Sequence, residues 1–160
     1  VVAVIGLGYV GLPLALAFAE NDFHVLGFDV DEQKIRDLEA GRSYIGHVDG
    51  ERVANAVTSD RLAVTADFGK LDRADAILIC VPTPLTTHRE PDLRYVEDTA
   101  RAIRQRLRPG QLVVLESTTY PGTTREVVQP ELEKSGLQIG KDVFLCFSPE
   151  RVDRAHAHPV

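Results

Sequence analysis

Residues 1–14 read VVAVIGLGYVGLPL, in which a run of mostly β-branched residues meets three glycines and then a helix-forming pattern. A G-x-G-x-x-G turn between a strand and a helix is typical of a dinucleotide-binding βαβ unit. The first glycine permits a tight bend, the second lets a pyrophosphate approach the backbone, and the third lets helix and strand pack closely. The turn residues predicted to hold the pyrophosphate are Gly6, Leu7, Gly8, Tyr9, Val10 and Gly11.

A carboxylate follows the glycines at the distance that such a unit requires. Residues 12–18 form an apolar helical segment, residues 23–28 read as a second strand, and Asp29 ends that strand, 18 residues after Gly11. An acidic residue about 20 positions past the glycines can accept from the ribose hydroxyls of NAD and repel the 2′-phosphate of NADP. The pattern therefore predicts NAD as cofactor. The alternative is a structural βαβ unit whose glycines serve packing alone.

The composition is that of an ordinary globular domain. The chain has 160 residues, 44% of them hydrophobic and 26% charged, enough for one self-sufficient core. A net charge of −6 argues against nucleic acid or an anionic membrane as partner, and no apolar run has the length of a bilayer span. A phosphate-bearing ligand must therefore be held by local N–H groups and individual cations.

The two cysteines lie in apolar runs typical of strands. Cys80 falls within residues 76–81 and Cys146 within residues 143–147. Free cysteine is among the most buried residue types, so we expect two buried, reduced thiols and a cytoplasmic location. Their spacing to the five histidines matches no metal site, and no metal is predicted.

Strands and helices alternate along the rest of the chain with short connections. Strands are expected at residues 62–65, 74–81, 111–116 and 143–147, and helices at residues 31–40, 49–57 and 123–132, the last opened by a Thr123/Glu126 capping box. Another helix, capped by Asp92, has its core positions at Val96, Thr99, Ala100, Ile103 and Leu107. This alternation predicts an α/β fold of Rossmann type, a doubly wound parallel sheet of strand order 3-2-1-4-5-6 with helices on both faces.

In such a sheet, ligands bind in the crevice beyond the carboxyl ends of the strands. Thr83 and the hydroxyl run Ser117, Thr118 and Thr119 follow two of the predicted strands, and Glu150 follows the last. Lys34 is the notable cation of the helix at residues 31–40. From spacing alone, alternatives stay open: a solvated lysine, a turn-forming threonine between prolines, and a surface glutamate.

Four motifs carry a more specific resemblance. They are GLGYVGLP (6–13), VPTPL (81–85) with REPDL (89–93), ESTTYPGTT (116–124) and FSPERV (147–152). In this order, and covering the whole chain, they resemble the N-terminal domain of nucleotide-sugar 6-dehydrogenases. The two-proline form of the second motif, with REPDL after it, is more similar to UDP-N-acetylglucosamine 6-dehydrogenases than to UDP-glucose dehydrogenases.

The resemblance implies an NAD-dependent, four-electron oxidation of the C6 alcohol of a UDP-sugar through two hydride transfers, for polysaccharide precursor synthesis. UDP-N-acetylglucosamine or UDP-N-acetylmannosamine is the favoured substrate. In that family a cysteine of a later domain forms a thiohemiacetal and then a thioester, and neither Cys80 nor Cys146 matches it.

The sequence begins without methionine, ends in AHPV, and looks cut at both ends. We therefore expect residues 1–160 to be the NAD-binding domain of a longer protein, inactive alone. With the resemblance, this places central helical and C-terminal substrate domains outside the chain and implies a homodimer or higher oligomer.

The resemblance also assigns roles residue by residue. The glycine turn would hold the pyrophosphate, and Asp29 and Lys34 the adenosine ribose. Val81, Thr83 and Pro84 would line the nicotinamide side. Ser117, Thr118 and Thr119 would reach the cofactor and a catalytic water. Glu150 would be the general base of the hydrolytic step.

One departure from the family leaves the sugar open, because Arg154-Ala155 replaces the usual Pro-Gly after Glu-Arg-Val-Asp. Two other functions remain as alternatives: a dehydrogenase of the same fold acting on a hydroxy acid, and an NAD-sensing domain without chemistry.

Overall fold

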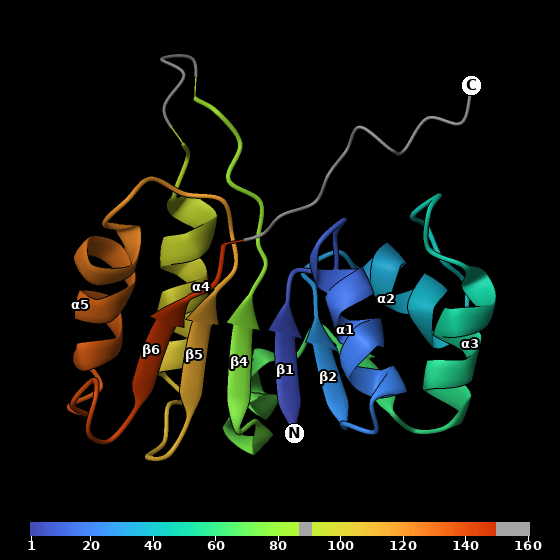
Figure 1. The fold of residues 1–160 in the computed structure, drawn as a ribbon, viewed down its shortest axis with the longest axis horizontal. Coiled ribbons are helices and arrows are strands. Elements are labelled where there is room, and N and C mark those ends of the chain that lie inside the picture. Colours follow the sequence, from blue (N-terminus) through green and yellow to red (C-terminus); the bar gives the residue numbers. More distant parts are fainter. Residues whose placement is uncertain (87–90, 150–160) are drawn as a thin grey trace.

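A six-stranded parallel sheet forms the centre of the computed structural model, which describes residues 1–86 and 91–149 (Figure 1). The strand order is β3-β2-β1-β4-β5-β6, as predicted. The strands are β1 (Val2–Ile5), β2 (Val25–Phe28), β3 (Leu62–Thr65), β4 (Ala76–Ile79), β5 (Leu112–Leu115) and β6 (Phe144–Phe147).

Helices connect these strands. They are α1 (Gly11–Glu20), α2 (Glu32–Glu39), α3 (Gly50–Thr58), the 3₁₀ helix η1 (Phe68–Arg73), α4 (Arg94–Arg104), the π-helix η2 (Thr124–Val128) and α5 (Gln129–Glu133). None of the helices in the described ranges has the length and apolar character needed to cross a bilayer.

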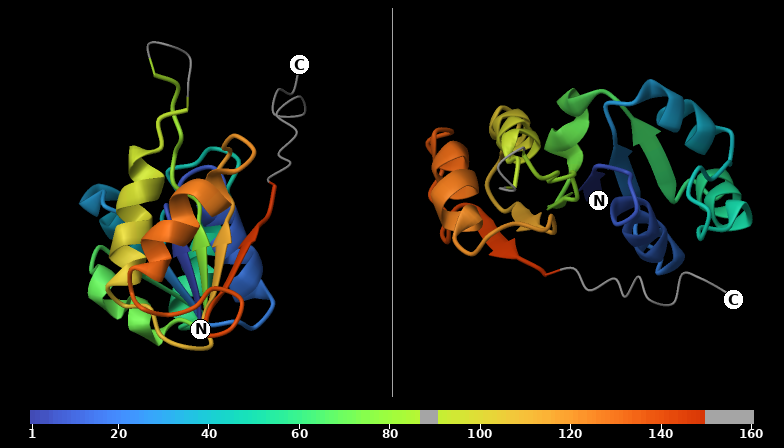
Figure 2. Two further views of the ribbon diagram at one scale, coloured as in Figure 1. Left: turned by 90° about the vertical axis from the view of Figure 1, so that its left-hand side faces the viewer. Right: turned by 90° about the horizontal axis from the view of Figure 1, so that it is seen from above.

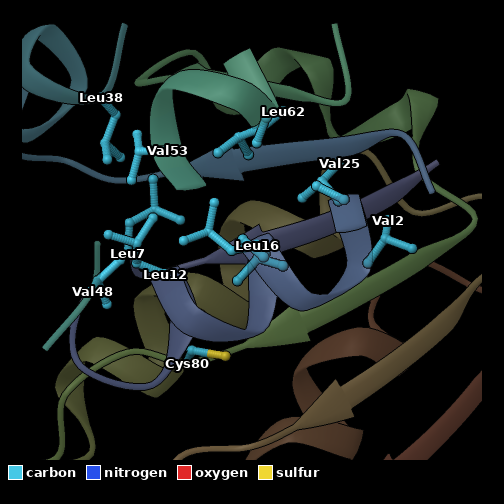
Figure 3. Close-up of a cluster of buried hydrophobic side chains, with 14 of the residues drawn as sticks. Val2, Leu7, Leu12, Leu16, Val25, Leu38, Val48, Val53, Leu62 and Cys80 are labelled. Carbon is cyan, nitrogen blue, oxygen red and sulfur yellow. The ribbon is translucent and has the colours of Figure 1, made fainter. Parts of the chain in front are cut away.

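Helices cover both faces of the sheet (Figure 2). Each face has its own core of buried side chains. Because successive side chains of a strand alternate, Val4, Leu78 and Val114 belong to the cluster that includes residues of α1, α2 and α3. Their neighbours Ile5, Ile79 and Leu115 belong to the opposite cluster, with residues of α4, α5, η1 and η2. Figure 3 shows the first cluster, in which Leu12 and Leu16 of α1 lie near Leu7.

The carboxyl ends of all six strands are level with one another. Ile5 pairs with both Phe28 and Ile79, Ile79 pairs with Leu115, and Leu115 pairs with Phe147. Phe28 also pairs with Thr65 at the end of β3. The segments that follow these strands therefore emerge at the same edge of the sheet, where parallel α/β folds bind their ligands.

Two of the predicted helix starts are confirmed by their caps. The Asp31 carboxylate accepts from the N–H groups of Gln33 and Lys34 at the start of α2. Asp49 accepts from the N–H of Glu51 at the start of α3. Both side chains satisfy N–H groups that a helix leaves unpaired at its start.

The predicted capping box at Thr123 is wrong. Thr123 has helical backbone angles, φ −48° and ψ −41°, and so lies in the helical path instead of the extended conformation of a cap. Its hydroxyl donates to the carbonyl of Tyr120, while the carbonyl of Gly122 accepts from the N–H groups of both Arg125 and Glu126. The segment opens as the π-helix η2 and only then continues as α5.

The expectation of two buried thiols is half wrong. Cys80 is buried just beyond the end of β4, but Cys146 is exposed. Cys146 lies on the terminal strand β6, beside Val114 and two residues from Phe144, whose side chain is 51% exposed. An edge strand is packed from fewer sides than a central one, so its apolar sequence does not ensure burial.

The start of α4 also differs from its prediction. Leu93 occupies the cap position without a side-chain hydrogen bond, although the Asp92 carboxylate one residue earlier accepts from the N–H of Arg94. Leu107, predicted as a core position of this helix, lies beyond its end and is half-buried.

Candidate functional site

A cleft of about 950 Å³ opens at the carboxyl edge of the sheet, between the glycine turn and the segments after β2, β4 and β5. Most of the predicted site residues line it: Gly6, Gly8, Tyr9, Val10, Asp29, Lys34, Val81, Thr83, Pro84, Ser117 and Thr118. Three of them, Leu7, Gly11 and Thr119, do not. Glu150 lies outside the described residues.

The glycine turn presents backbone donors to this cleft. The N–H groups of Gly8, Tyr9, Val10 and Gly11 make no hydrogen bond to any described residue, and they stand at the N-terminus of α1. A helix N-terminus carries about half a positive elementary charge, which favours an anion there. A Cβ atom at Gly8 would meet no atom within 4 Å, so the backbone at this point faces open space.

Two other turn residues serve structure. A Cβ atom at Gly11 would lie 1.8 Å from the carbonyl oxygen of Gly6, which explains the glycine as a requirement of close packing. The Leu7 side chain is fully buried in the cluster of Figure 3. The backbone N–H of Leu7 donates to Asp29 Oδ2 at 3.0 Å. Leu7 thereby fixes the turn to the end of β2.

Asp29 is a buried carboxylate at the edge of the cleft, with only 6% of the residue exposed. Besides Leu7, its Oδ2 accepts from Lys34 Nζ at 3.1 Å, and its Oδ1 accepts from the N–H of Asp31 at 3.0 Å. These donors fix the orientation of the carboxylate. Lys34 is therefore tied to Asp29, and the alternative of a merely solvated lysine is wrong.

Hydroxyl groups tie the segments after β4 and β5 together. The Ser117 hydroxyl lies within 2.7 Å of the Val81 carbonyl oxygen and 3.2 Å of the Ile79 carbonyl oxygen, and it is buried. The Thr83 hydroxyl donates to the carbonyl of Thr118. The Thr118 side chain itself is exposed to the cleft, and its hydroxyl has no hydrogen-bond partner among residues 1–86 and 91–149.

We expect Ser117→Ala to lower the free energy of unfolding by about 1 kcal/mol, because the Val81 carbonyl then loses its hydrogen bond. The Ile79 carbonyl keeps the N–H groups of Glu116 and Ser117 as donors. Denaturant titration monitored by circular dichroism measures the change. The control is Ser135→Ala, where the hydroxyl accepts from Leu137 in a surface loop. If Ser117→Ala is as stable as wild type, the hydrogen bond between Ser117 and Val81 does not stabilise the fold.

Helix α4 supplies a wall of the cleft that the sequence reading missed. Thr99 was predicted as a core position with no part in a site; it is buried as predicted, with 7% of the residue exposed, but it also lines the cleft. Tyr95, Asp98 and Ala102, on the same side of the helix, line it as well. The spacing i, i+3, i+4 and i+7 marks one helix face, but no motif distinguishes a face at the margin of the core from one inside it.

Titratable side chains in the described ranges form no group of three that could hold a metal ion. The polar groups that line the cleft include the backbone of the glycine turn, the Asp29 and Lys34 pair and the hydroxyls of Thr83 and Thr118.

Comparison with known proteins assigns almost the whole chain to one family. Residues 1–158 match the UDP-glucose/GDP-mannose dehydrogenase family, NAD binding domain. The chain is 40% identical over 159 residues to Protein CapL of Staphylococcus aureus, covering 97% of this chain and 36% of that protein. It is 39% identical over 153 residues to UDP-N-acetyl-D-glucosamine 6-dehydrogenase of Pseudomonas aeruginosa, covering 95% of this chain and 35% of that protein.

A solved structure agrees in fold as well as in sequence. The ternary complex of GDP-mannose dehydrogenase from Pseudomonas aeruginosa superposes with a TM-score of 0.91 at 33% identity, covering 94% of this chain and 36% of that one. The chain spans about a third of the length of the relatives it matches. It belongs to the UDP-glucose/GDP-mannose dehydrogenase family, of which it is the NAD-binding domain.

Proposed function

We propose that the intact protein is an NAD-dependent nucleotide-sugar 6-dehydrogenase, which oxidises the C6 alcohol of a UDP-sugar to the carboxylate for polysaccharide precursor synthesis. The observation that carries the proposal is the row of three cleft-lining N–H groups, those of Gly8, Tyr9 and Val10, which have no acceptor among residues 1–86 and 91–149 and lie at the same cleft as a buried carboxylate. Relatives named for UDP-N-acetyl-D-glucosamine and UDP-N-acetyl-D-mannosamine support one of these two sugars as substrate.

The proposal includes the setting of the domain. Residues 1–160 form the cofactor-binding part of a longer chain, which works in the cytoplasm as a homodimer or higher oligomer, without nucleic acid or membrane partners. Further domains provide the sugar pocket and the catalytic cysteine. The coverage of about a third of each relative supports this division.

The described residues fit a dinucleotide. The N–H groups from Gly8 to Gly11 suit the charge of a diphosphate at the start of α1. The Asp29 Oδ1 atom has one N–H donor and so keeps a lone pair for a ribose hydroxyl, while Lys34 holds Oδ2. The volume of about 950 Å³ lies within the range of cofactor sites.

The other end of the cleft suits the nicotinamide, which when bound accepts the hydride. Val81, Thr83 and Pro84 line this end, held in place by the hydroxyls of Thr83 and Ser117. The Thr118 hydroxyl is left to bind cofactor or the catalytic water. Thr119 does not line the cleft, so we assign it no direct contact.

The test is titration of the intact protein with NAD by calorimetry, followed by a panel of UDP-sugars with NADH absorbance as readout. We expect NAD to bind and two NADH to form per molecule of one UDP-N-acetylhexosamine. NADH formed only with a hydroxy acid would support the other dehydrogenase reading, and NAD binding without turnover would support a sensor. Absence of NAD binding would overturn both the proposal and these alternatives.

We expect Glu150→Gln to slow turnover about 10²- to 10⁴-fold, the usual contribution of a general base. Because the expected role is in hydrolysis, the dissociation constant of NAD should stay unchanged. Steady-state kinetics and calorimetry on the intact protein separate these two effects. The control is Glu133→Gln, an exposed carboxylate of α5. Wild-type turnover of Glu150→Gln would remove Glu150 from the mechanism.

A further inference from the structure

Tyr44 reaches the glycine turn from a distant part of the chain. It lies between α2 and α3, is half-buried, and does not line the cleft. Its hydroxyl donates to the Leu7 carbonyl oxygen at 2.5 Å, across 37 positions of sequence. No motif of the sequence includes Tyr44, and none of the roles assigned above uses it.

The contact fixes the orientation of one peptide group. The Leu7 carbonyl and the Gly8 N–H belong to the same planar trans peptide and point in opposite directions. A donor that holds the carbonyl therefore also directs the Gly8 N–H, which has no acceptor among the described residues. The backbone at Gly8 faces open space, where a diphosphate would bind.

The peptide on the other side of Leu7 is held as well. The Leu7 N–H donates to Asp29 Oδ2, so the two peptides that flank Leu7 are fixed by Asp29 and Tyr44. Such support matters in this turn, because glycine allows the backbone many conformations and Gly6 adopts a φ of 91°.

The ring of Tyr44 contacts the same network from a second side. Lys34 Nζ lies 5.9 Å from the ring centroid, within the range of a cation–π interaction, and 3.1 Å from Asp29 Oδ2. Burial, and after it the charge of Asp29, raises the pKa of Tyr44 well above that of a free tyrosine. The hydroxyl therefore keeps its proton and remains a donor.

We propose that Tyr44 is a positioning residue for the cofactor: its hydroxyl directs the Gly8 N–H toward the diphosphate, and its ring holds Lys34 against Asp29 beside the ribose. The inference rests on the proposed binding of NAD in this cleft. It assigns two separable effects to two parts of one side chain. Loss of the hydroxyl weakens binding of the diphosphate alone, whereas loss of the ring also weakens binding of the adenosine.

The test compares Tyr44→Phe and Tyr44→Leu in the intact protein, with NAD and adenosine as ligands in calorimetry and competition. For Tyr44→Phe we expect the dissociation constant of NAD to rise about fivefold, the effect of one lost hydrogen bond, with no change for adenosine. For Tyr44→Leu we expect both constants to rise. In both variants the KM for NAD rises while kcat at saturating NAD stays constant.

The control is Tyr120→Phe, an exposed tyrosine outside the cleft lining, which should match wild type. Wild-type NAD affinity in Tyr44→Phe would overturn the inference and leave the proposed function standing. An equal loss for NAD and adenosine in Tyr44→Phe would also overturn it, because that result indicates general damage to the site. A wild-type protein that binds no NAD overturns the proposed function, and this inference with it.

Discussion

Gly8→Ala is expected to remove most NAD binding while leaving the domain as stable as wild type. A Cβ atom at Gly8 would meet no protein atom within 4 Å, so the methyl group projects into the space of the cleft. A diphosphate would then be kept from the N–H groups of the turn. Loss of one or two charge-assisted hydrogen bonds raises the dissociation constant about 100-fold. Calorimetry with NAD and thermal melting without ligand measure the two quantities.

Two other glycines provide the comparison. Gly11→Ala would place a Cβ atom 1.8 Å from the Gly6 carbonyl oxygen, so it should lower the free energy of unfolding by about 3 kcal/mol or more. Gly50→Ala, in α3, would meet the Gly41 carbonyl oxygen at 4.0 Å, so it should leave NAD affinity unchanged and should not lower the free energy of unfolding. Wild-type NAD affinity in Gly8→Ala would show that the diphosphate binds elsewhere.

The strand order could be predicted because few topologies satisfy the pattern. A glycine turn after the first strand, alternating strands and helices, and right-handed crossovers lead to the doubly wound order that the structure has. The strand ends could not be predicted as well. Ala74 and Cys80 were expected in the fourth strand, and both are buried but lie outside β4. An apolar run indicates burial, and burial extends beyond the residues that pair within the strand.

The errors have local causes. The Thr123 and Glu126 pattern matches a capping box, but the pattern cannot reveal that Thr123 already has helical angles. Cys146 lies in a sequence as apolar as that of a central strand, and its exposure follows from its place on β6 at the edge of the sheet. The predicted strand order already places residues 143–147 at the edge of the sheet, so the error came from inferring burial from the apolar residues of the strand alone.

Some residues of the candidate site could be predicted from the sequence and others could not. Residues that follow strands, such as Asp29 and Thr118, could be predicted to line one cleft, because the carboxyl ends of parallel strands share one edge. The contributions of Thr99 and Tyr44 could not be predicted in this way. Thr99 reaches the cleft from the face of a helix, and Tyr44 reaches Leu7 across 37 positions. Such contacts depend on how elements pack and leave no spacing signal.

Asp29→Asn is expected to change the choice between NAD and NADP. The carboxylate accepts from Leu7 and Asp31 N–H groups and from Lys34 Nζ. An amide of the same shape must turn its NH₂ group toward one of these donors, which weakens the site for the ribose of NAD. For NADP this loss is offset, because the negative charge that repels the 2′-phosphate is gone and Lys34 is free to pair with it.

In Asp29→Asn we therefore expect the dissociation constant of NAD to rise. We also expect the ratio of NADP to NAD affinity to increase about tenfold or more, because the charge of Lys34 then pairs with the 2′-phosphate, a contact of about 1.5 kcal/mol. Calorimetry with both dinucleotides gives the ratio. Asp37→Asn is the control, because Asp37 lies on α2, pairs with Arg42 and does not line the cleft. An unchanged ratio in Asp29→Asn would mean that NADP is rejected by the shape of the cleft and not by this charge.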